Sequence, residues 1–390
     1  MFYSKNEHIF AMCSNYKLKM DTFNYMFDRK IPYNELPKLP PLKEFLDTEI
    51  LLKWGLASRS LAELNKNVFR IPNPSMLVNT IALQEAQSSS AIENIFTTAD
   101  ELYKAISDTV NEETANPATK EVLFYREALW SGYNKLMEQK FIDKSTIVSI
   151  FQKIKQTNQG FRSPQSQVII KRGNSDFRSG ETVYTPPRGA GIIDEKMDNL
   201  LEFMSDKNEL DPLLKMTISH YQFEAIHPFI DGNGRTGRIL NLLYLIEQNL
   251  LSHPVLYLSK YIIENKDDYY HLLSGVTQRQ DWKSWVLFML NAVDETSKHT
   301  NTKIDEILSQ MDATFEYVKP KLKWYSLELN QALFSQPYVK QSLIGKMTNA
   351  KSRTTVTNYM SKLVEYGVLS TKVDGREVYF VNNDLIRILG

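Results

Sequence analysis

The sequence predicts a mainly α-helical protein that contains one short β-hairpin and ends in a small unit of helix, turn, helix and wing. Three observations lead to this prediction. Apolar residues recur at three- and four-residue intervals through most of the chain. Residues 168–185 instead hold two short β-prone runs around a stretch rich in Gly, Ser, Asn and Asp. The segment 326–390 combines two short helical patterns with a hairpin signal at Asp374 and Gly375.

The helical pattern is clear in most of the chain before residue 300. The expected helices are Leu42–Leu64, Ser75–Ala91, Lys120–Met137, Ile192–Met204, Pro212–Ile226, Arg235–Gln248 and Trp282–His299. Prolines just before the first of them indicate an extended connector. We expect Asp211 to cap the helix that Pro212 begins. The breaker Ile71-Pro72-Asn73-Pro74 separates the first two helices.

The β-prone runs and the C-terminal pattern complete the secondary structure. Val168-Ile169-Ile170 and Thr182-Val183-Tyr184-Thr185 are the expected strands of the hairpin. A charged helical linker leads from Asn301 to Lys323. Beyond it, Val339–Met347 and Ser352–Tyr366 are expected to form two helices ahead of the wing.

The length and composition indicate a globular protein of several packed regions. At 390 residues the chain exceeds the size of a single hydrophobic core. We divide it into an N-terminal helical region (1–119), a central core (120–300), a helical linker (301–325) and a C-terminal domain (326–390). Lys plus Arg equal Asp plus Glu at 46 each, so overall charge does not indicate nucleic acid or membrane as a partner.

The expected location is cytoplasmic. Cys13 is the only cysteine, so no internal disulfide can form, and a reducing environment is the simpler interpretation. The first residues lack a basic region followed by an apolar run, and no uninterrupted apolar stretch of about 18 residues occurs.

The strongest functional signal is the stretch His227-Pro228-Phe229-Ile230-Asp231-Gly232-Asn233-Gly234-Arg235-Thr236-Gly237-Arg238. It links two predicted helices. Glycines let a backbone turn tightly and approach an anion, and the first turn of a helix has unpaired N–H groups and a positive dipole. An ordinary interhelical turn is the alternative, but base, acid, glycines and arginines in one short stretch favour a phosphate site.

Individual residues of this stretch suit phosphate chemistry. His227 has an ordinary pKa near neutrality and suits a general base. Asp231 supplies a hard oxygen ligand of the kind that Mg²⁺ prefers. Arg235 and Arg238 lie three residues apart, hence on one helix face, and both are expected to reach phosphate oxygens.

The stretch resembles the signature of the Fic family, His-Pro-Phe-x-Asp/Glu-Gly-Asn-Gly-Arg-x-x-Arg, at every defined position. Fic proteins are mainly α enzymes that mostly transfer AMP. The resemblance implies a helical core with a hairpin flap, ATP as the AMP donor, Mg²⁺ as cofactor, and a protein hydroxyl of Ser, Thr or Tyr as acceptor, with the chain itself among the targets. Members that transfer phosphate replace the second glycine of Gly-Asn-Gly, so Gly234 favours AMP transfer.

The resemblance also implies a role for each residue of the loop. His227 deprotonates the target hydroxyl, Asp231 holds the metal, and Arg238 engages the terminal phosphate. The phosphates are cradled from Gly232 to Arg235, and the full nucleotide-binding set is Gly232, Asn233, Gly234, Arg235, Thr236, Gly237 and Arg238. An aromatic after the catalytic helix contacts adenine in similar proteins. Tyr270 is the candidate here, although helical aromatics are more often core.

Two further segments resemble parts of Fic enzymes. Ser89-Ser90-Ala91-Ile92-Glu93-Asn94 is similar to the inhibitory motif, in which Ser89 and Glu93 are the defining residues, and Glu93 would pair with Arg238 in place of the γ-phosphate. A surface glutamate at a helix end is the alternative. Thr182–Pro187 resembles the flap, whose edge holds the target segment by main-chain hydrogen bonds, and a plain surface hairpin competes with that interpretation.

The C-terminal domain resembles a winged helix. Its formal charge from Lys340 to Gly390 is modestly positive, and the start of its second helix would carry the residues that contact DNA: Lys351, Arg353, Thr354, Thr355 and Asn358. Winged helices also bind proteins or form dimers, so a DNA partner and a homodimer are both left open.

Two rival functions are weighed against AMP transfer. One is a DNA-binding regulator whose Fic fold only senses nucleotide, although a sensor has no need of the base His227. The other is an enzyme of the same fold that removes AMP or transfers another phosphate-linked group.

Overall fold

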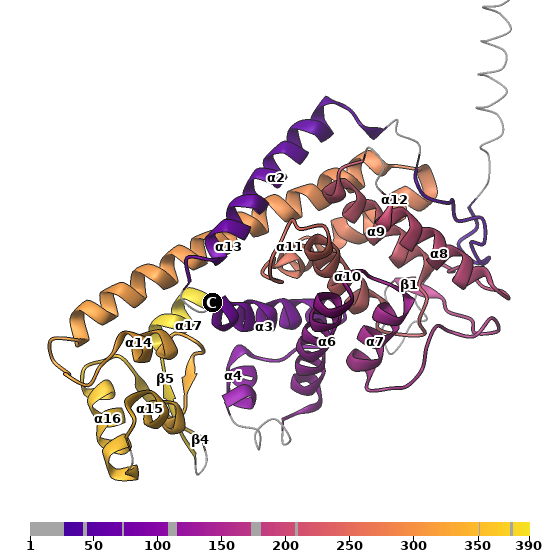
Figure 1. The fold of residues 1–390 in the computed structure, drawn as a ribbon. Coiled ribbons are helices and arrows are strands. Elements are labelled where there is room, and N and C mark those ends of the chain that lie inside the picture. The colour runs from indigo at the N-terminus through magenta and orange to yellow at the C-terminus, as the bar shows by residue number, and fades with distance from the viewer. Residues whose placement is uncertain are drawn as a thin grey trace, which may run out of the picture.

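Helices dominate the molecule, as the sequence predicts (Figure 1). The computed structural model describes residues 27–41, 45–71, 74–107, 115–172, 181–206, 210–350, 352–374 and 377–390. Some sequence-based predictions lie outside these residues. They are the helix start at Leu42, the breaker residues Pro72 and Asn73, the hairpin tip at 173–180, and the features at Cys13, Lys351 and Gly375.

The described elements follow one another in this order. The first group is α2 (Thr48–Val68), α3 (Pro74–Ile92), α4 (Ala99–Ser107), α6 (Pro117–Gln139), α7 (Lys144–Lys155), β1 (Ile170–Arg172), β2 (Glu181–Tyr184), α8 (Ile192–Ser205), α9 (Pro212–Ile226) and α10 (Asn233–Glu247). The second group is α11 (Leu258–Glu264), α12 (Lys266–Arg279), α13 (Trp282–Val318), α14 (Leu327–Leu333), β3 (Tyr338–Val339), α15 (Gln341–Thr348), α16 (Arg353–Glu365), β4 (Ser370–Asp374), β5 (Glu377–Val381) and α17 (Asn383–Leu389).

The helices α9 and α10 form the centre of the molecule. Every residue of α9 from Leu213 to Ile226 is buried, and α10 is buried from Arg235 to Ile246. The helices α6, α7 and α8 pack around them, with α3 against α6. A helix that is buried on all sides has little amphipathic pattern, so tertiary packing rather than local propensity stabilises it. The loop between α9 and α10 therefore has rigid supports on both sides.

The long helix α13 extends along α2 and continues toward the C-terminal domain (Figure 1). The two helices run in the same direction, since Lys53 and Ser60 contact Asp294 and Asn67 contacts Asn301. The buried Asp294 carboxylate accepts from Lys53 at 2.8 Å. Burial alone would raise the pKa of Asp294, but its bonds to Lys53, Ser60 and Lys298 lower it to about 2.

Several predicted helix boundaries differ from the structure. The first helix begins at Thr48, because the Asp47 side chain accepts the Ile50 N–H and so starts the helix there. Helix α13 does not end at His299 but runs on to Val318, so the boundary predicted at residues 300 and 301 lies inside one helix. The prediction for Pro212–Ile226 is confirmed, with Asp211 accepting from the Leu213 N–H.

The hairpin is shorter than the sequence indicates. Val168 and Ile169 lie outside β1, which begins at Ile170 with an irregular register, and Thr185 lies outside β2. Helices α4, α7, α11, α12, α14 and α17 and the strand β3 were not predicted. In α7, β-branched residues obscure the local helical propensity, and the packing against α6 decides the outcome.

The C-terminal domain has the predicted order of two helices followed by a hairpin. Helices α15 and α16 precede β4 and β5, and the three strands pair antiparallel in the order β3-β5-β4. The second of these helices, α16, begins at Arg353, and the Ser352 side chain caps it by accepting the Thr355 N–H.

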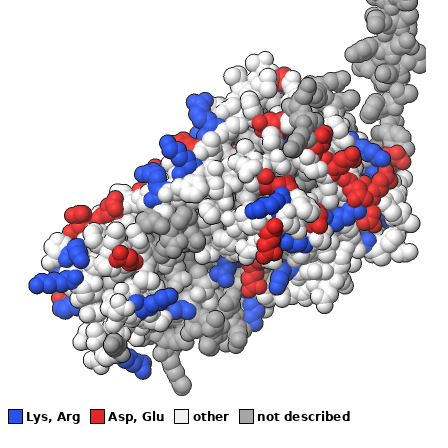
Figure 2. Space-filling model, in the orientation of Figure 1, with Lys and Arg blue, Asp and Glu red and all other residues white. Residues whose placement is uncertain are grey.

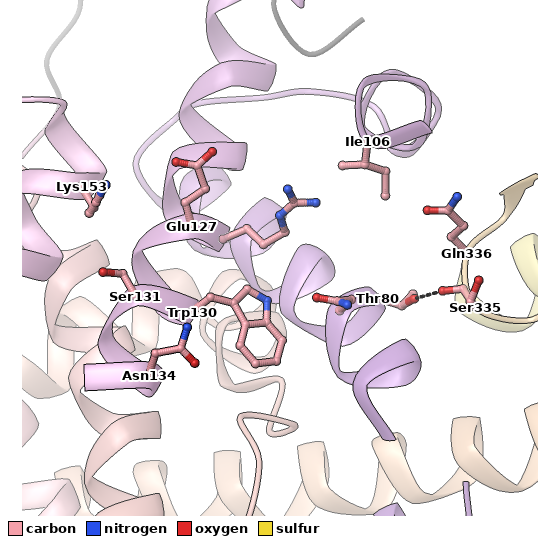
Figure 3. Close-up of a pocket in the computed structure, with 11 residues that line it drawn as sticks. Thr80, Ile106, Glu127, Trp130, Ser131, Asn134, Lys153, Ser335 and Gln336 are labelled. Carbon is pink, nitrogen blue, oxygen red and sulfur yellow. Dashed lines mark hydrogen bonds between the residues drawn. The ribbon is translucent and has the colours of Figure 1, made fainter. Parts of the chain in front are cut away.

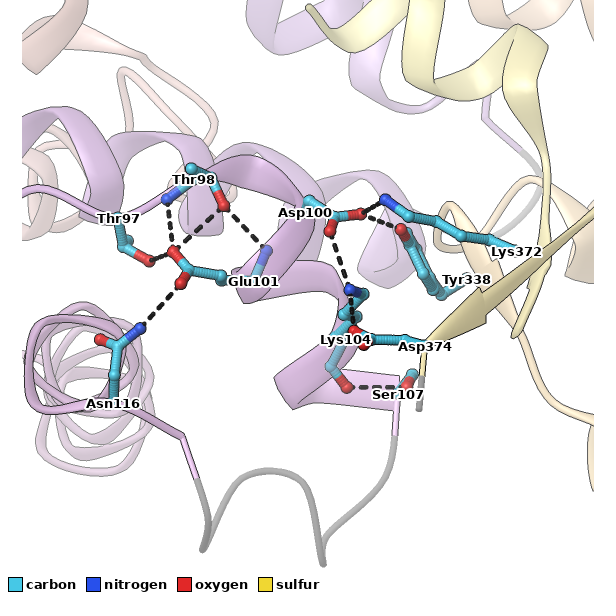
Figure 4. Close-up of polar contacts among 10 residues, drawn as sticks. All are labelled: Thr97, Thr98, Asp100, Glu101, Lys104, Ser107, Asn116, Tyr338, Lys372 and Asp374. Carbon is cyan, nitrogen blue, oxygen red and sulfur yellow. Dashed lines mark hydrogen bonds and ion pairs between the residues drawn. The ribbon is translucent and has the colours of Figure 1, made fainter. Parts of the chain in front are cut away.

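This domain is docked on the rest of the molecule through a cluster of charged side chains (Figure 4). Asp100 of α4 accepts hydrogen bonds from Lys372 of β4 and Tyr338 of β3, and Lys104 pairs with both Asp100 and Asp374. Burial opposes ionisation of Asp100, but its bond to Lys372 and its other donors lower its pKa to about 2. On the other side, Lys303 of α13 donates to the Ile388 and Leu389 carbonyls.

Figure 2 shows the charges on one face of the molecule. Lys and Arg are prominent over the C-terminal domain at the lower left, whereas Asp and Glu are grouped on the right, with Lys and Arg among them. Within the described ranges, no helix is both long and apolar enough to cross a membrane.

Candidate active site

The predicted phosphate loop joins α9 to α10 at the centre of the fold. His227 ends α9 in the left-handed conformation, with φ 51°, and its N–H donates to the Phe223 carbonyl at 3.0 Å. Gly232 begins α10 with φ 78°, a conformation that favours glycine. The loop thus reverses the direction of the chain between two buried helices that pack against each other.

Internal hydrogen bonds fix the shape of this loop. Phe229 and Asn233 bond reciprocally: the Phe229 N–H donates to the Asn233 side chain, whose amide donates back to the Phe229 carbonyl, both at 2.9 Å. The Thr236 hydroxyl donates to the Gly232 carbonyl at 2.9 Å. The Phe229 ring is buried and stacks on Phe151 of α7 at 3.9 Å between centroids. The side chains of Asn233 and Thr236 therefore hold the loop in shape, and contact of these residues with a nucleotide stays a prediction.

The His227 imidazole is oriented by its own helix. Its Nδ1 lies 3.3 Å from the Glu224 carbonyl oxygen. A carbonyl only accepts, so the proton is on Nδ1 and the lone pair is on Nε2. Burial lowers the pKa of His227 to about 4. The side chain is therefore neutral near pH 7, the state that a general base requires.

Arg238 is held by the end of α3. Its side chain is only 1% exposed, and it donates to the Ser89 hydroxyl at 2.7 Å and to the Ser89 carbonyl at 2.9 Å. Its Nη2 also donates to Glu93 Oε1 at 2.8 Å. The structure therefore brings Ser89 and Glu93 into contact with Arg238, which lies at least 145 residues later in the sequence.

Two glycines of α10 leave room for carboxylates. A Cβ on Gly234 would collide with Glu93 Oε1 and would lie 2.9 Å from Arg238. A Cβ on Gly237 would lie 2.5 Å from Glu224 Oε1. Burial raises the pKa of Glu224 to about 8, so its carboxyl is mostly neutral near pH 7. Gly234 allows Glu93 to approach the first turn of α10, and Gly237 allows α9 to pack closely.

Arg235 already has a carboxylate partner from another helix. Its side chain is 2% exposed, and its Nη1 pairs with Glu121 of α6 at 2.8 Å. Arg238, three residues further along α10, pairs instead with Glu93 and Ser89 at the end of α3. Contact of Arg235 with a phosphate stays a prediction.

Both oxygens of Asp231, the predicted metal ligand, already have partners within the protein. Oδ2 pairs with Lys155 of α7 at 2.6 Å, and Oδ1 accepts the Gly232 N–H at 2.6 Å. Burial would raise the pKa of Asp231, but the Lys155 bond results in a net lowering. Among the described residues, no group of three or more His, Cys, Asp or Glu could hold a metal. One carboxylate fits Mg²⁺ only where nucleotide phosphates supply further oxygens.

The aromatic pair on α12 has one buried and one accessible member. Tyr269 is buried, and its hydroxyl lies 2.9 Å from His220 Nε2, in keeping with a structural role for His220. Tyr270 is 37% exposed and packs edge-on against Tyr269. Burial raises the pKa of Tyr270, and the negative charge of Glu93 raises it further.

The sequence did not predict a role in the site for Glu121, Lys155, Arg162 or Glu224. It also did not predict the contact that Tyr184 of the flap makes with α9. Arg162 is buried before β1 and donates to carbonyls of the loop, and the Tyr184 hydroxyl donates to the Ala225 carbonyl at 2.8 Å. These residues carry no local motif. Only Tyr184 lies in a segment that the sequence marks, namely the β-prone run 182–185 of the predicted flap.

A separate polar cavity of about 830 Å³ lies away from this loop (Figure 3). It lies between α3, α6 and α7 and reaches the C-terminal domain, where Thr80 donates to the Ser335 carbonyl. Its lining consists of Asn79, Thr80, Ile106, Arg126, Glu127, Trp130, Ser131, Asn134, Lys153, Ser335 and Gln336. None of the predicted site residues belongs to this lining.

Family models match three parts of the chain. The model of the N-terminal region of the Fic/DOC family matches residues 51–134, and the Fic/DOC family model matches residues 141–245. A model of the C-terminal domain of SoFic-like protein adenylyltransferases matches residues 310–385.

Individual proteins are similar over shorter stretches. A probable protein adenylyltransferase from Aquifex aeolicus (strain VF5) is 28% identical over 171 residues, or 43% of this chain and 42% of the relative. The protein adenylyltransferase Fic of Drosophila mojavensis is 26% identical over 165 residues, or 41% of this chain and 31% of the relative. The chain thus spans less than half the length of these relatives.

One solved structure supports the fold. It is the crystal structure of a Fic family protein from Desulfovibrio desulfuricans G20, with a TM-score of 0.54 and 20% identity. The likeness covers 86% of this chain and 96% of that chain.

Proposed function

This chain belongs to the Fic/DOC family, and on that premise we propose that it transfers the AMP of ATP to a hydroxyl side chain of a protein. The observation that carries the proposal is the neutral His227 with its Nε2 lone pair, positioned where α9 meets the first turn of α10. The names of similar proteins support the same activity.

In the proposed reaction His227 acts on the nucleophile. Its Nε2 takes the proton from the hydroxyl of a Ser, Thr or Tyr side chain as the oxygen attacks the α-phosphorus. The bond from the α-phosphorus to the bridging oxygen breaks, and pyrophosphate leaves. The Nδ1 bond to the Glu224 carbonyl keeps the ring in the tautomer that this step requires. Catalysis then depends chiefly on position and on charge at the leaving group.

The first turn of α10 is the proposed phosphate cradle. Its N–H groups lack intrahelical partners, and the helix dipole favours an anion there. Arg238 is the proposed partner of the terminal phosphate, and Tyr270 is the proposed adenine contact. Asp231 would hold Mg²⁺ together with the phosphates, and the ion would neutralise negative charge on the leaving group.

We also propose that Glu93 inhibits the transfer. The Glu93 carboxylate bonds Arg238 and lies against Gly234, so it fills the space that we propose for the terminal phosphate. A bound carboxylate and a phosphate compete for one guanidinium, so ATP binds productively only when Glu93 has left. Ser89 retains two bonds to Arg238 and would keep the arginine in place after Glu93 leaves.

The flap of residues 182–187 is the proposed docking edge for the protein substrate. One of its main-chain acceptors is already engaged, since the Thr185 carbonyl accepts the Tyr33 N–H at 3.0 Å. Segment 27–41 therefore lies beside the end of the flap. Docking of a target segment would use the remaining main-chain groups of the hairpin.

Intact mass tests this proposal most directly. Purified protein and a lysate incubated with ATP and Mg²⁺ should each gain the mass of one AMP per modified site. His227→Ala should abolish that gain while ATP binding stays nearly unchanged, because His227 acts on the nucleophile and not on the phosphates. Equal labelling by wild type and His227→Ala would contradict the catalytic role. Loss of AMP from modified protein would instead favour the reverse reaction.

DNA binding by the C-terminal domain stays a prediction. Docking of the wing residue Lys372 on Asp100 leaves α16 as the element that DNA would contact. If it binds through phosphates, affinity should fall steeply with salt and Arg353→Ala should weaken it. A homodimer and the cytoplasmic location also stay predictions.

A further inference from the structure

Arg162 holds together the turn that carries His227 and the end of the flap. Its Nε donates to the His227 carbonyl at 2.9 Å, and its Nη2 donates to the carbonyls of Ile226 and Pro187. Its backbone N–H donates to the Pro228 carbonyl at 2.9 Å. One residue therefore satisfies three consecutive carbonyls at the end of α9 and links them to the segment after β2.

We propose that Arg162 is a positioning residue that sets His227 at a fixed distance from the flap, so that the base meets a hydroxyl docked on that edge. This inference rests on the proposed AMP transfer and adds a determinant that neither the loop motif nor the flap contains. Arg162 does not touch the reacting atoms. It acts through the backbone of His227 and Pro187.

The geometry of the turn requires such a support. The last carbonyls of a helix lack intrahelical partners, and His227 adopts a left-handed conformation that costs free energy for a residue with a Cβ. Arginine presents several N–H groups in a planar fork, so it can bond separate acceptors at once, whereas lysine is a single flexible point charge. Tyr184 adds a second link from the flap, through the Ala225 carbonyl.

Arg162 is also one of the charges that face His227. Glu93 from the end of α3 and Asp231 from the loop oppose its effect on the imidazole, and the Glu224 carbonyl bonds Nδ1. Lys155 offsets Asp231 through their ion pair. A variant that removes the charge at position 162 would therefore change both the position of His227 and the electrostatic potential at its imidazole. The most informative variant keeps the charge.

Arg162→Lys is that variant. It retains the positive charge but cannot satisfy the Ile226, His227 and Pro187 carbonyls together. We expect the maximal rate of AMP transfer to fall about tenfold to a hundredfold, since small misplacements of a catalytic group have effects of that size. ATP affinity, measured by calorimetry, should change less than about twofold, because α10 is not touched. Tyr184→Phe, which frees only the Ala225 carbonyl, should lower the rate less.

Arg70→Lys is the matched control. Arg70 is an exposed arginine after α2 that pairs with Asp305 of α13, and the substitution again keeps the charge. This pair belongs neither to the loop nor to the hairpin, so transfer should stay at the wild-type rate. Thermal unfolding of each variant tells whether a lower rate only follows a lower folded fraction.

Imidazole nitrogen NMR gives a readout that does not depend on transfer. In wild type the His227 signal, identified by its absence from His227→Ala, should show the Nδ1–H tautomer. In Arg162→Lys a mixture of both tautomers is expected. A wild-type rate and an unchanged tautomer in folded Arg162→Lys would overturn the inference, as would a rate loss explained by unfolding alone. If wild type transfers no AMP, the proposed function fails, and the tautomer alone decides whether Arg162 positions His227.

Discussion

Two clusters of paired charges join distant parts of this molecule, and they differ in burial. At the loop between α9 and α10, the Arg238 side chain is 1% exposed and is held by Glu93 and Ser89. At the C-terminal domain, Lys372 is 46% exposed and Asp100 36% exposed. Both clusters link α3 or α4 to an element more than a hundred residues away. A buried guanidinium left without a partner costs much free energy, whereas an exposed ammonium can return to water, so we expect the two clusters to respond differently when one partner is removed.

Replacing the cation at each site should separate the two clusters most clearly. Removal of one partner from a buried pair costs about 3 to 5 kcal/mol, and we place Arg238→Ala near the lower limit because Glu93 is partly exposed. Lys372→Ala should cost about 1 kcal/mol or less. Denaturant unfolding at neutral pH measures both values. Equal losses for the two variants would contradict the comparison.

Freeing the buried arginine should change activity in the opposite direction. Glu93→Gly should raise AMP transfer, including transfer to the protein itself, by about tenfold or more, because it removes a charge-assisted bond of about 1.5 to 3 kcal/mol. Glu93→Gln, which keeps the size but not the charge, should give a smaller gain. The double variant Glu93→Gly with Arg238→Ala should lose the gain. If folded Glu93→Gly transfers AMP at an unchanged or lower rate, Glu93 is not inhibitory and is only a glutamate at the end of a helix.

The buried environment of the loop also predicts the pH dependence of transfer. Burial lowers the folded-state pKa of His227 to about 4 from an ordinary value of 6.5. The base therefore stays neutral, and transfer should persist as pH falls from 7 to about 5. Over the same range the unfolded chain binds a proton that the folded chain does not, so this residue lowers stability as pH falls from about 6.5 toward 4. If the rate of transfer instead falls to half near pH 6.5, His227 has the pKa of a solvent-exposed histidine, and the prediction is wrong.

The exposed cluster should give the smallest effect. Asp100→Asn should lower the free energy of unfolding by about 1 kcal/mol or less and should leave AMP transfer unchanged. The folded-state pKa of Asp100 is lowered to about 2 from 3.8. Its contribution is therefore complete above about pH 4 and is lost as pH falls toward 2. Unfolding at low and high salt should show the difference from wild type shrinking with salt. A larger loss that resists salt would indicate a buried interface.

Local sequence signals were sufficient for the loop and for the helices with clear ends. Glycines and the helix start at Arg235 indicated where the backbone would turn, and Asp211 with Pro212 marked the start of α9. The helical linker expected after Asn301 is helical as far as Val318 but continues the preceding helix without a break, because charged residues beyond His299 still favour helix. The strand at Val168 and Ile169 was wrong because β-propensity depends on pairing partners.

The sequence by itself determined the chemistry available to this protein: a base, an acid, glycines and arginines within twelve residues, which the chain can only present at one turn. Tertiary structure decided how that chemistry is divided. It directed Arg235 to Glu121 and Arg238 to Glu93, and it placed Arg162 on the backbone of His227. Residue spacing fixes which side chains share a helix face, but the partner of a buried charge depends on which distant helix packs there, and that follows from the burial of the whole core.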